Sequence, residues 1–113
     1  MRGDVVIVDF RPLNPAAKVR PAVVIQSDRH NARLANTIIV QITSNVSRAH
    51  EDTQLLIDQT HPDWANSGLR LPSVINAANL ATVLQAHITH VIGHLSTTTM
   101  SKLDECLKSA LDL

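Results

Sequence analysis

The chain has 113 residues, of which 44% are hydrophobic and 18% are charged, and its formal net charge is zero. This length suits one domain, residues 1–113, with room for one hydrophobic core, and the composition excludes a disordered chain. Only 2% of the residues are aromatic, which argues against a platform of rings on which several bases of a single-stranded nucleic acid stack.

The zero net charge conceals an uneven distribution along the chain. Residues 1–50 carry seven basic and three acidic side chains, a net charge of +4, whereas residues 51–113 carry three basic and seven acidic ones, a net charge of −4. If the two halves fold onto different surfaces, a basic face is available to phosphates; if their charges interleave, no such face forms. The sequence leaves both arrangements open.

The compartment is predicted from two further features. No apolar run approaches the roughly 20 residues that a membrane-spanning helix needs, and the N-terminus lacks the parts of a signal peptide. The single cysteine, Cys106, cannot form an internal disulfide, as expected in a reducing compartment. We therefore expect a cytoplasmic protein without membrane contact, in which Cys106 is a small apolar helix residue rather than a reactive thiol.

The first half of the chain predicts three strands. The apolar run at residues 5–9 is a short buried strand, followed by a proline-containing loop. Pro21 opens a second strand that runs through Gln26, because proline is tolerated at the first position of a strand. Residues 37–42 are rich in β-branched side chains and predict the third strand. The polar segment between these two strands, residues 28–35, allows a short helical turn.

The second half predicts shorter strands and one clear helix. A polar, mobile loop at residues 43–52 precedes the first of these strands, and a helical turn near residues 61–65 follows it. The predicted strand segments are residues 54–57, 74–75, 80–83 and 87–95. Many short strands with one terminal helix imply a mainly β fold, a small barrel or twisted sheet of the SH3-like or OB-like kind.

The terminal helix is predicted from an apolar stripe. Met100, Leu103, Leu107 and Leu111 recur at helical spacing, and residues 96–99 supply candidates for the N-cap. We expect this stripe to seal one side of the sheet.

Polar side chains that suit a phosphate stand at the ends of two predicted strands. Arg20 precedes the second strand, and Thr43 and Ser44 close the third. An arginine stays protonated and grips two phosphate oxygens at once, and a hydroxyl donates to the same group. These residues favour a nucleic-acid site. The alternative is that Arg20 pairs with a surface carboxylate and that Thr43 and Ser44 cap a loop.

The order of the segments resembles the MazF/PemK (Kid) family of toxin ribonucleases from type II toxin–antitoxin systems. The resemblance is carried by Arg2-Gly3-Asp4-Val5, Arg20-Pro21-Ala22-Val23-Val24, Thr43-Ser44, Ser67-Gly68-Leu69, Ser73-Val74-Ile75, Leu80-Ala81-Thr82-Val83 and Ile92-Gly93-His94-Leu95-Ser96. It implies an SH3-like barrel of the CcdB/Kid/MazF type with a C-terminal helix, a homodimer, and a cognate antitoxin with an acidic, disordered tail.

The resemblance also implies an activity. Such toxins are metal-independent, cofactor-free endoribonucleases that cut single-stranded RNA, including mRNA, at short sequences, leaving a 2′,3′-cyclic phosphate and a 5′-hydroxyl. Arg20 and Thr43 match the catalytic arginine and threonine of the family. The side chains expected to contact RNA are Lys18, Arg29, Arg33, Ser44, Arg48 and Arg70. We expect the loops after the second and third strands to bring Arg29, Arg33 and Arg48 to the face of the site; the alternative is solvated loop charge.

No obvious general base is found among the residues that match the family. The first loop has no glycine and no glutamate, glutamine or histidine, and the arginine and aspartate that follow the fifth strand in the Kid branch correspond to Asn76 and Ala78. His30 and His50, in the loops nearest the proposed site, are the better candidates for a base. Two alternatives to a fully active enzyme therefore stay open: a CcdB-like toxin that acts by protein binding, and a catalytically weakened homologue.

Three other histidines raise the question of a metal. His87, His90 and His94 have a spacing that aligns them in a helix. The segment fits a strand better, and positions 87 and 90 of a strand point to opposite faces. We therefore expect surface or interface histidines and no metal site.

Overall fold

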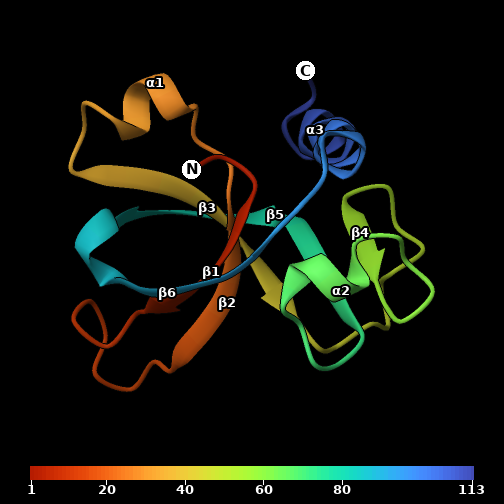
Figure 1. Ribbon diagram of the computed structural model, residues 1–113, viewed down its shortest axis with the longest axis horizontal. Coiled ribbons are helices and arrows are strands. Elements are labelled where there is room, and N and C mark those ends of the chain that lie inside the picture. Colours follow the sequence, from red (N-terminus) through yellow and green to blue (C-terminus); the bar gives the residue numbers. More distant parts are fainter.

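The computed structural model describes residues 1–113, which form a six-stranded antiparallel sheet, three short helical elements and a C-terminal helix (Figure 1). The strands are β1 (Asp4–Asp9), β2 (Val19–Val24), β3 (Asn36–Thr43), β4 (Gln54–Ile57), β5 (Ser73–Leu84) and β6 (Ile88–His94). The helical elements are α1 (Asp28–Asn31), α2 (Trp64–Ser67), η1 (Gln85–His87) and α3 (Thr97–Leu111). The sheet order is β4-β5-β3-β2-β1-β6. This is the predicted fold class, mainly β with a C-terminal helix. None of the helices has the length and apolar character needed to span a membrane.

The second strand lies two residues closer to the N-terminus than predicted. Val19 and Arg20 already belong to β2, because β1 extends its pairing as far as Val19. Pairing of β2 with β3 starts only at Ala22. Pro21 therefore has a strand neighbour on one side alone, which is the setting in which a strand tolerates proline.

The two predicted strand pieces at residues 74–75 and 80–83 are one strand, β5, of 12 residues. Its pairing with β3 shifts between two positions, since Val40 pairs with Leu80 and the next residue, Gln41, pairs with Asn76. Residues 77–79 are thus a bulge without partners in β3. Alanine and asparagine have low strand propensity, which is why this segment looked like an interruption in the sequence.

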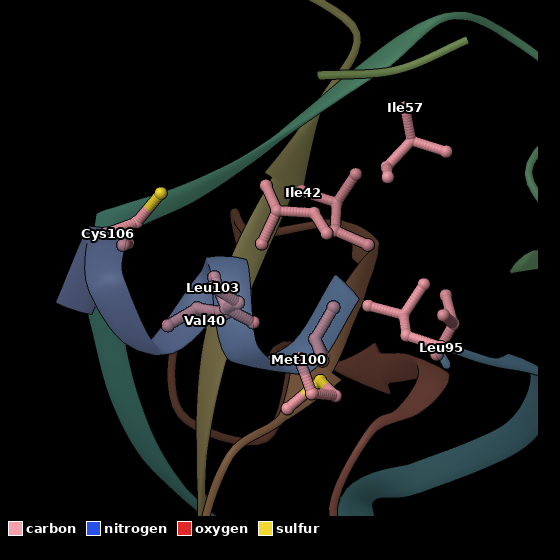
Figure 2. Packing of buried hydrophobic residues seen from close by; sticks show 11 residues of the cluster. Val40, Ile42, Ile57, Leu95, Met100, Leu103 and Cys106 are labelled. Carbon is pink, nitrogen blue, oxygen red and sulfur yellow. The ribbon is translucent and has the colours of Figure 1, made fainter. Parts of the chain in front are cut away.

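The helix α3 begins as predicted and covers one face of the sheet. The Ser96 hydroxyl is its N-cap and accepts a hydrogen bond from the Thr99 N–H. Met100 and Leu103 are buried against the strands (Figure 2). The predicted stripe is wrong at its end, because Leu111 is 50% exposed beyond the edge of the core.

Cys106 extends the buried face of α3. It is one of the side chains of the core cluster shown in Figure 2, and burial raises the pKa of its thiol. This confirms that Cys106 is an apolar helix residue.

Alternation along the strands gives the sheet two different faces. Val5, Val23 and Val40 lie in register on the face that α3 covers. In the next row, Val6 and Ala22 lie on the other face and belong to a second apolar cluster. The residues that continue this row across the sheet are polar, so the second face is apolar at one end and polar at the other.

Asp63 ties the loop before α2 to the start of α3. Its carboxylate is 5% exposed and accepts the Ser96 N–H at 2.8 Å and the Ser96 hydroxyl at 3.0 Å. Burial acts to raise the pKa of Asp63, but hydrogen bonds from Thr99 and Ser96 outweigh it, so that the pKa lies below its ordinary value of 3.8.

We expect Asp63→Ala to lower the free energy of unfolding by about 1–3 kcal/mol at pH 7, because the donors of Ser96 lose their buried acceptor. A carboxyl whose pKa is lowered by folding stabilises the protein above its ordinary pKa, and this contribution is lost as the pH falls through the folded-state pKa. Urea denaturation from pH 7 to pH 3 should therefore show the two proteins converging at low pH. A difference that is independent of pH, or no difference at pH 7, would contradict this role; Asp63→Asn is the control that keeps an acceptor without the charge.

Candidate functional site

The pairing of β2 with β3 places Arg20 and Thr43 side by side at one end of the sheet. Ala22 pairs with Gln41, and continuing the same register by two residues sets Arg20 opposite Thr43. Both residues share the face of Ala22 and Gln41, which is the face that α3 does not cover. They also line the same two surface cavities. The structure thus brings together the two side chains that the sequence singled out.

The larger of these cavities has a volume of about 550 Å³, and only one of its ten lining residues is hydrophobic. Side-chain amides dominate it, and we call it the amide groove. Its polar lining consists of Arg20, Thr43, Ser47, Arg48 and the amides Gln41, Asn45, Gln54, Asn76 and Asn79. Amides offer both donors and acceptors without charge, so the groove suits a ligand with a varied hydrogen-bonding edge.

Arg20 also borders two smaller cavities. One, of about 250 Å³, holds Thr43, Ser44 and Arg70 together with Arg20. Another, of about 380 Å³, lies beneath the loop between β1 and β2 and includes Lys18 and the apolar Leu13. Arg20 therefore stands where three cavities meet, at the point from which a bound chain can extend in more than one direction.

The electrostatics of the site are those of an anion-binding surface. Arg20, Arg70 and Lys18 take part in none of the ion pairs of the structure. Arg48 lies 3.6 Å from Glu51 in an exposed pair. No aspartate, glutamate or histidine lines any of the three cavities. The alternative in which Arg20 pairs with a carboxylate is therefore not observed, and its five donors are available to a ligand.

Thr43 has a local contact that leaves its proton free. Its hydroxyl oxygen accepts the N–H of Asn45 at 3.1 Å, so the predicted loop cap does form. A hydroxyl that accepts one hydrogen bond still has its own proton to donate. Capping thus fixes the orientation of Thr43 while its O–H remains able to reach a ligand in the groove.

The loop between β1 and β2 starts from an ion pair. The Arg11 guanidinium donates to both carboxylate oxygens of Asp9, at 2.9 and 2.8 Å. These hydrogen bonds lower the pKa of Asp9 to about 2. Arg11 is therefore occupied within its own loop and adds little to the positive charge around Arg20.

The expected position of Arg29 and Arg33 is wrong. They lie in and just after α1, which follows the end of β2 and precedes the start of β3. Arg20 stands at the opposite end of β2, and Thr43 closes β3 after eight residues, roughly 23 Å along the strand. Figure 1 shows α1 at the upper end of the sheet, with β3 running away from it. An antiparallel pair returns the chain to its starting end, so the connection between its strands lies far from the site.

Neither candidate base lines the site. His30 lies in α1, at the same distant end, where its Nδ1 is 2.9 Å from the Ser27 hydroxyl. His50 is exposed in the turn after Arg48 and lines none of the three cavities. Loop proximity misplaced His30, because the strand directions carry α1 to the other end of the sheet. His50 does lie in the loop that follows Thr43, but its side chain lines none of the cavities.

The three histidines with helical spacing do not share a helix. His87 ends η1, while His90 and His94 lie in β6, as predicted. Nowhere in the chain do three His, Cys, Asp or Glu side chains come together as a possible metal site. His94 instead lies with its Nδ1 2.8 Å from the Asp4 carboxylate.

The amides Gln41, Gln54 and Asn76 are the site residues that sequence reasoning missed. Gln54 of β4 pairs with Asn76 of β5, which pairs with Gln41 of β3. The three side chains therefore form one row across the exposed face. A signal was present in β3, where the polar Gln41 and Thr43 flank the buried Ile42, but the bulge in β5 concealed the partner strand.

Because Arg20 is exposed and unpaired, we expect it to be dispensable for folding. Arg20→Ala should leave the thermal midpoint of unfolding unchanged within about 2 °C. Leu103→Ala, at a position that is fully buried, should lower the free energy of unfolding by about 2–5 kcal/mol and is the matched positive control. Circular dichroism melts of the three proteins provide the measurement. A large loss of stability in Arg20→Ala would mean that its guanidinium has a structural partner.

Comparison with known proteins gives one family. The family model described as "PemK-like, MazF-like toxin of type II toxin-antitoxin system" matches residues 1–111. Endoribonuclease EndoA of Bacillus subtilis is 32% identical over 114 residues, which cover 99% of this chain and 94% of the relative. Endoribonuclease MazF9 of Mycobacterium tuberculosis is 33% identical over 119 residues, covering 99% and 96%.

Solved structures share the fold. A mycobacterial endoribonuclease in complex with its cognate antitoxin superposes with a TM-score of 0.79 at 22% identity, covering 100% of this chain and 95% of that one. The Mycobacterium tuberculosis toxin MazF-mt6 superposes with a TM-score of 0.79 at 24% identity, covering 97% of each chain. The first superposition covers the whole chain and therefore all six strands and α3.

Proposed function

We propose a mode of action on RNA for this chain. The chain belongs to the PemK-like, MazF-like toxin family of type II toxin–antitoxin systems. It is the endoribonuclease toxin of such a system. Our proposal is that residues 1–113, as one toxin domain, cut single-stranded RNA at a short sequence, leaving a 2′,3′-cyclic phosphate and a 5′-hydroxyl. The observation that carries it is the unpaired Arg20 opposite Thr43, in a groove without carboxylates.

In this reaction a ribose 2′-oxygen attacks the adjacent phosphorus and the bond to the 5′-oxygen breaks. Negative charge accumulates on the phosphoryl oxygens in the transition state, so a fixed cation within hydrogen-bond reach lowers the barrier. Arg20 is that cation: it stays protonated, and its planar fork grips two oxygens. Its backbone is held in β2 opposite Val8 of β1, which limits the reorganisation needed during the reaction.

Thr43 acts beside Arg20 on the same phosphate. Its hydroxyl is oriented by the Asn45 N–H and donates its proton to a phosphoryl oxygen. Since no carboxylate or imidazole lines the groove, water accepts the proton of the 2′-hydroxyl and supplies one to the leaving 5′-oxygen. General-base assistance commonly contributes about 10²–10⁴ in rate, so we expect a slow enzyme that depends on charge stabilisation.

Four further residues extend the contact along the RNA. Ser44 and Arg70 line the small cavity on one side of Arg20, and Arg48 lies in the amide groove. Lys18, in the loop between β1 and β2, lines the third cavity. Contacts of this kind bind phosphates without reading sequence, and the affinity they supply falls as the salt concentration rises. Arg29 and Arg33, at the far end of the sheet, are left out of this track.

The same surface suits an antitoxin. An acidic, disordered tail laid over the groove would place carboxylates against Arg20, Arg70 and Lys18, which have no ion-pair partners within the chain. Such a tail competes directly with RNA for the same cations. We therefore propose that the antitoxin inhibits by occupying the cleavage site.

We expect the purified protein to cut a long single-stranded RNA in EDTA at a recurring short sequence. Arg20→Ala should lower the rate by about 10²-fold or more, because the transition-state charge loses its fixed partner. Gel mapping of the cleavage sites, with end-group analysis for cyclic phosphate, provides the measurement.

Three conservative substitutions, one at Arg20 and two at Thr43, separate effects on the chemistry from effects on folding. Arg20→Lys keeps the charge but not the two-pronged geometry, and should stay well below wild type. Thr43→Ser keeps the hydroxyl and should retain activity, whereas the isosteric Thr43→Val should lose it. A folded wild-type protein that leaves RNA intact at high enzyme concentration would overturn the proposal in favour of a toxin that acts by binding a protein.

We also propose a homodimer, as in the family. The edge strands β4 and β6 are each paired on one side only, and Val91 in β6 is 62% exposed, so unsatisfied strand edges and apolar surface are available. Light scattering coupled to gel filtration should give about twice the 12.3 kDa chain mass. A monomer at micromolar concentration that still cleaves RNA would contradict this assembly.

A further inference from the structure

We propose that Asn76, held in place by Gln54, reads one base of the RNA and so sets part of the cleavage sequence. This inference rests on the proposed ribonuclease function and adds a specificity role for residues outside the catalytic pair. It follows from the way the two amides are fixed, from the groups they leave free, and from their position relative to Arg20 and Thr43.

The orientation of the Asn76 amide is determined by a backbone donor. The Ala78 N–H donates to Asn76 Oδ1 at 3.0 Å. A backbone N–H has no acceptor role, so the atom that faces it must be the amide oxygen. The bulge at residues 77–79 supplies this donor, which links the irregularity in β5 to the direction in which Asn76 points.

Gln54 then has one possible orientation as well. Its Nε2 donates to Asn76 Oδ1 at 2.8 Å and to the Thr53 hydroxyl at 2.9 Å. Thr53 is itself held in place, because the Ala77 N–H donates to its carbonyl oxygen at 3.0 Å. Gln54 is therefore a positioning residue that locks Asn76, and the pair is preorganised before any ligand arrives.

The locked pair leaves a defined set of groups for a ligand. Asn76 Oδ1 already accepts two hydrogen bonds, so its remaining groups are the two N–H donors on Nδ2. Both protons of Gln54 Nε2 are used, so its free group is the acceptor Oε1. A fixed donor beside a fixed acceptor is the arrangement that pairs with the edge of a nucleobase, where acceptor and donor atoms also stand side by side.

The pair lies within one nucleotide of the proposed cleavage point. Asn76 pairs with Gln41, which precedes Thr43 by two residues on the same face. One strand across and two residues along correspond to roughly 8 Å between the Cα atoms of Asn76 and Thr43. Arg20, Thr43 and Asn76 line the same groove, so a phosphate held by Arg20 leaves a neighbouring base free to reach Asn76.

The test is an isosteric exchange at Asn76. In Asn76→Asp the oxygen that faces Ala78 and Gln54 is retained, while the two free donors become an acceptor. We expect the base preference at one position of the cleavage sequence to change by about tenfold, towards bases that present a donor there, because a good hydrogen bond is lost and an unfavourable contact is gained. The other positions should keep their preferences. Cleavage of a randomised RNA library, sequenced at the cut ends and normalised to total cutting, provides the measurement.

Controls separate this effect from added charge and from loss of fold. Asn79→Asp adds the same charge to the same groove, at an exposed residue without a side-chain hydrogen bond; it should slow cleavage of all sequences alike. Asn76→Ala, which adds no charge, should relax the preference at the same single position, and Gln54→Ala should weaken it there in part. Thermal melts identify any variant that does not fold.

The possible outcomes distinguish the inference from the function on which it rests. A wild-type protein that cuts at a recurring sequence, with Asn76→Asp and Asn76→Ala keeping every base preference, overturns the specificity role and leaves the ribonuclease proposal intact. Equal changes in Asn76→Asp and Asn79→Asp also overturn it, since charge alone then explains them. An uncut library with wild type overturns both.

Discussion

The register between β2 and β3 is the constraint on which the site depends. In this register Ala22 pairs with Gln41, so that Arg20 comes to stand opposite Thr43 although 22 residues of chain separate them. A slip of one residue would turn one of the two side chains to the other face of the sheet. The apolar rows on both faces prevent such a slip, because Val23 and Val40 must meet under α3 while Val24 and Ile39 must meet in the second cluster. The geometry of the polar site is thus enforced by the hydrophobic core.

The unequal cover of the two faces decides where the amide groove lies. The helix α3 buries one face through Met100, Leu103 and Cys106, and no comparable element covers the polar part of the other. One row of residues crosses that other face in register, from the apolar Val6 and Ala22 to the amides Gln41, Asn76 and Gln54. The change from apolar to amide side chains along this row marks the boundary between the second cluster and the groove. A single sheet face therefore belongs to the core at one end and lines the amide groove at the other.

The charges around Arg20 are also unevenly distributed. The three cavities around Arg20 have arginine, lysine, amide and hydroxyl side chains and no carboxylate. Asp9 is paired with Arg11, and Glu51 is paired with the groove residue Arg48 at an exposed position. A chain of zero net charge thus presents a locally positive surface, which concentrates an anionic polymer or an acidic peptide at the site. The same cavities contain no carboxylate or imidazole, which is why the proposed mechanism assigns the main role to charge stabilisation by Arg20.

The sequence by itself determined the mainly β class, the terminal helix with its cap, and the two polar strand ends at Arg20 and Thr43, because these depend on local periodicity and on residue type. Only the tertiary structure decided which of the polar residues meet. It joined two apparent strand pieces into β5 across a bulge that pairing with β3 tolerates. It moved Arg29, Arg33 and His30 to the far end of the sheet, because the connection between antiparallel β2 and β3 lies opposite to the ends that carry Arg20 and Thr43. It also brought Gln54 and Asn76 together across neighbouring strands. Strand register cannot be predicted from separations along the chain, and it is the register of β2, β3, β5 and β4 that brings the residues of this site together.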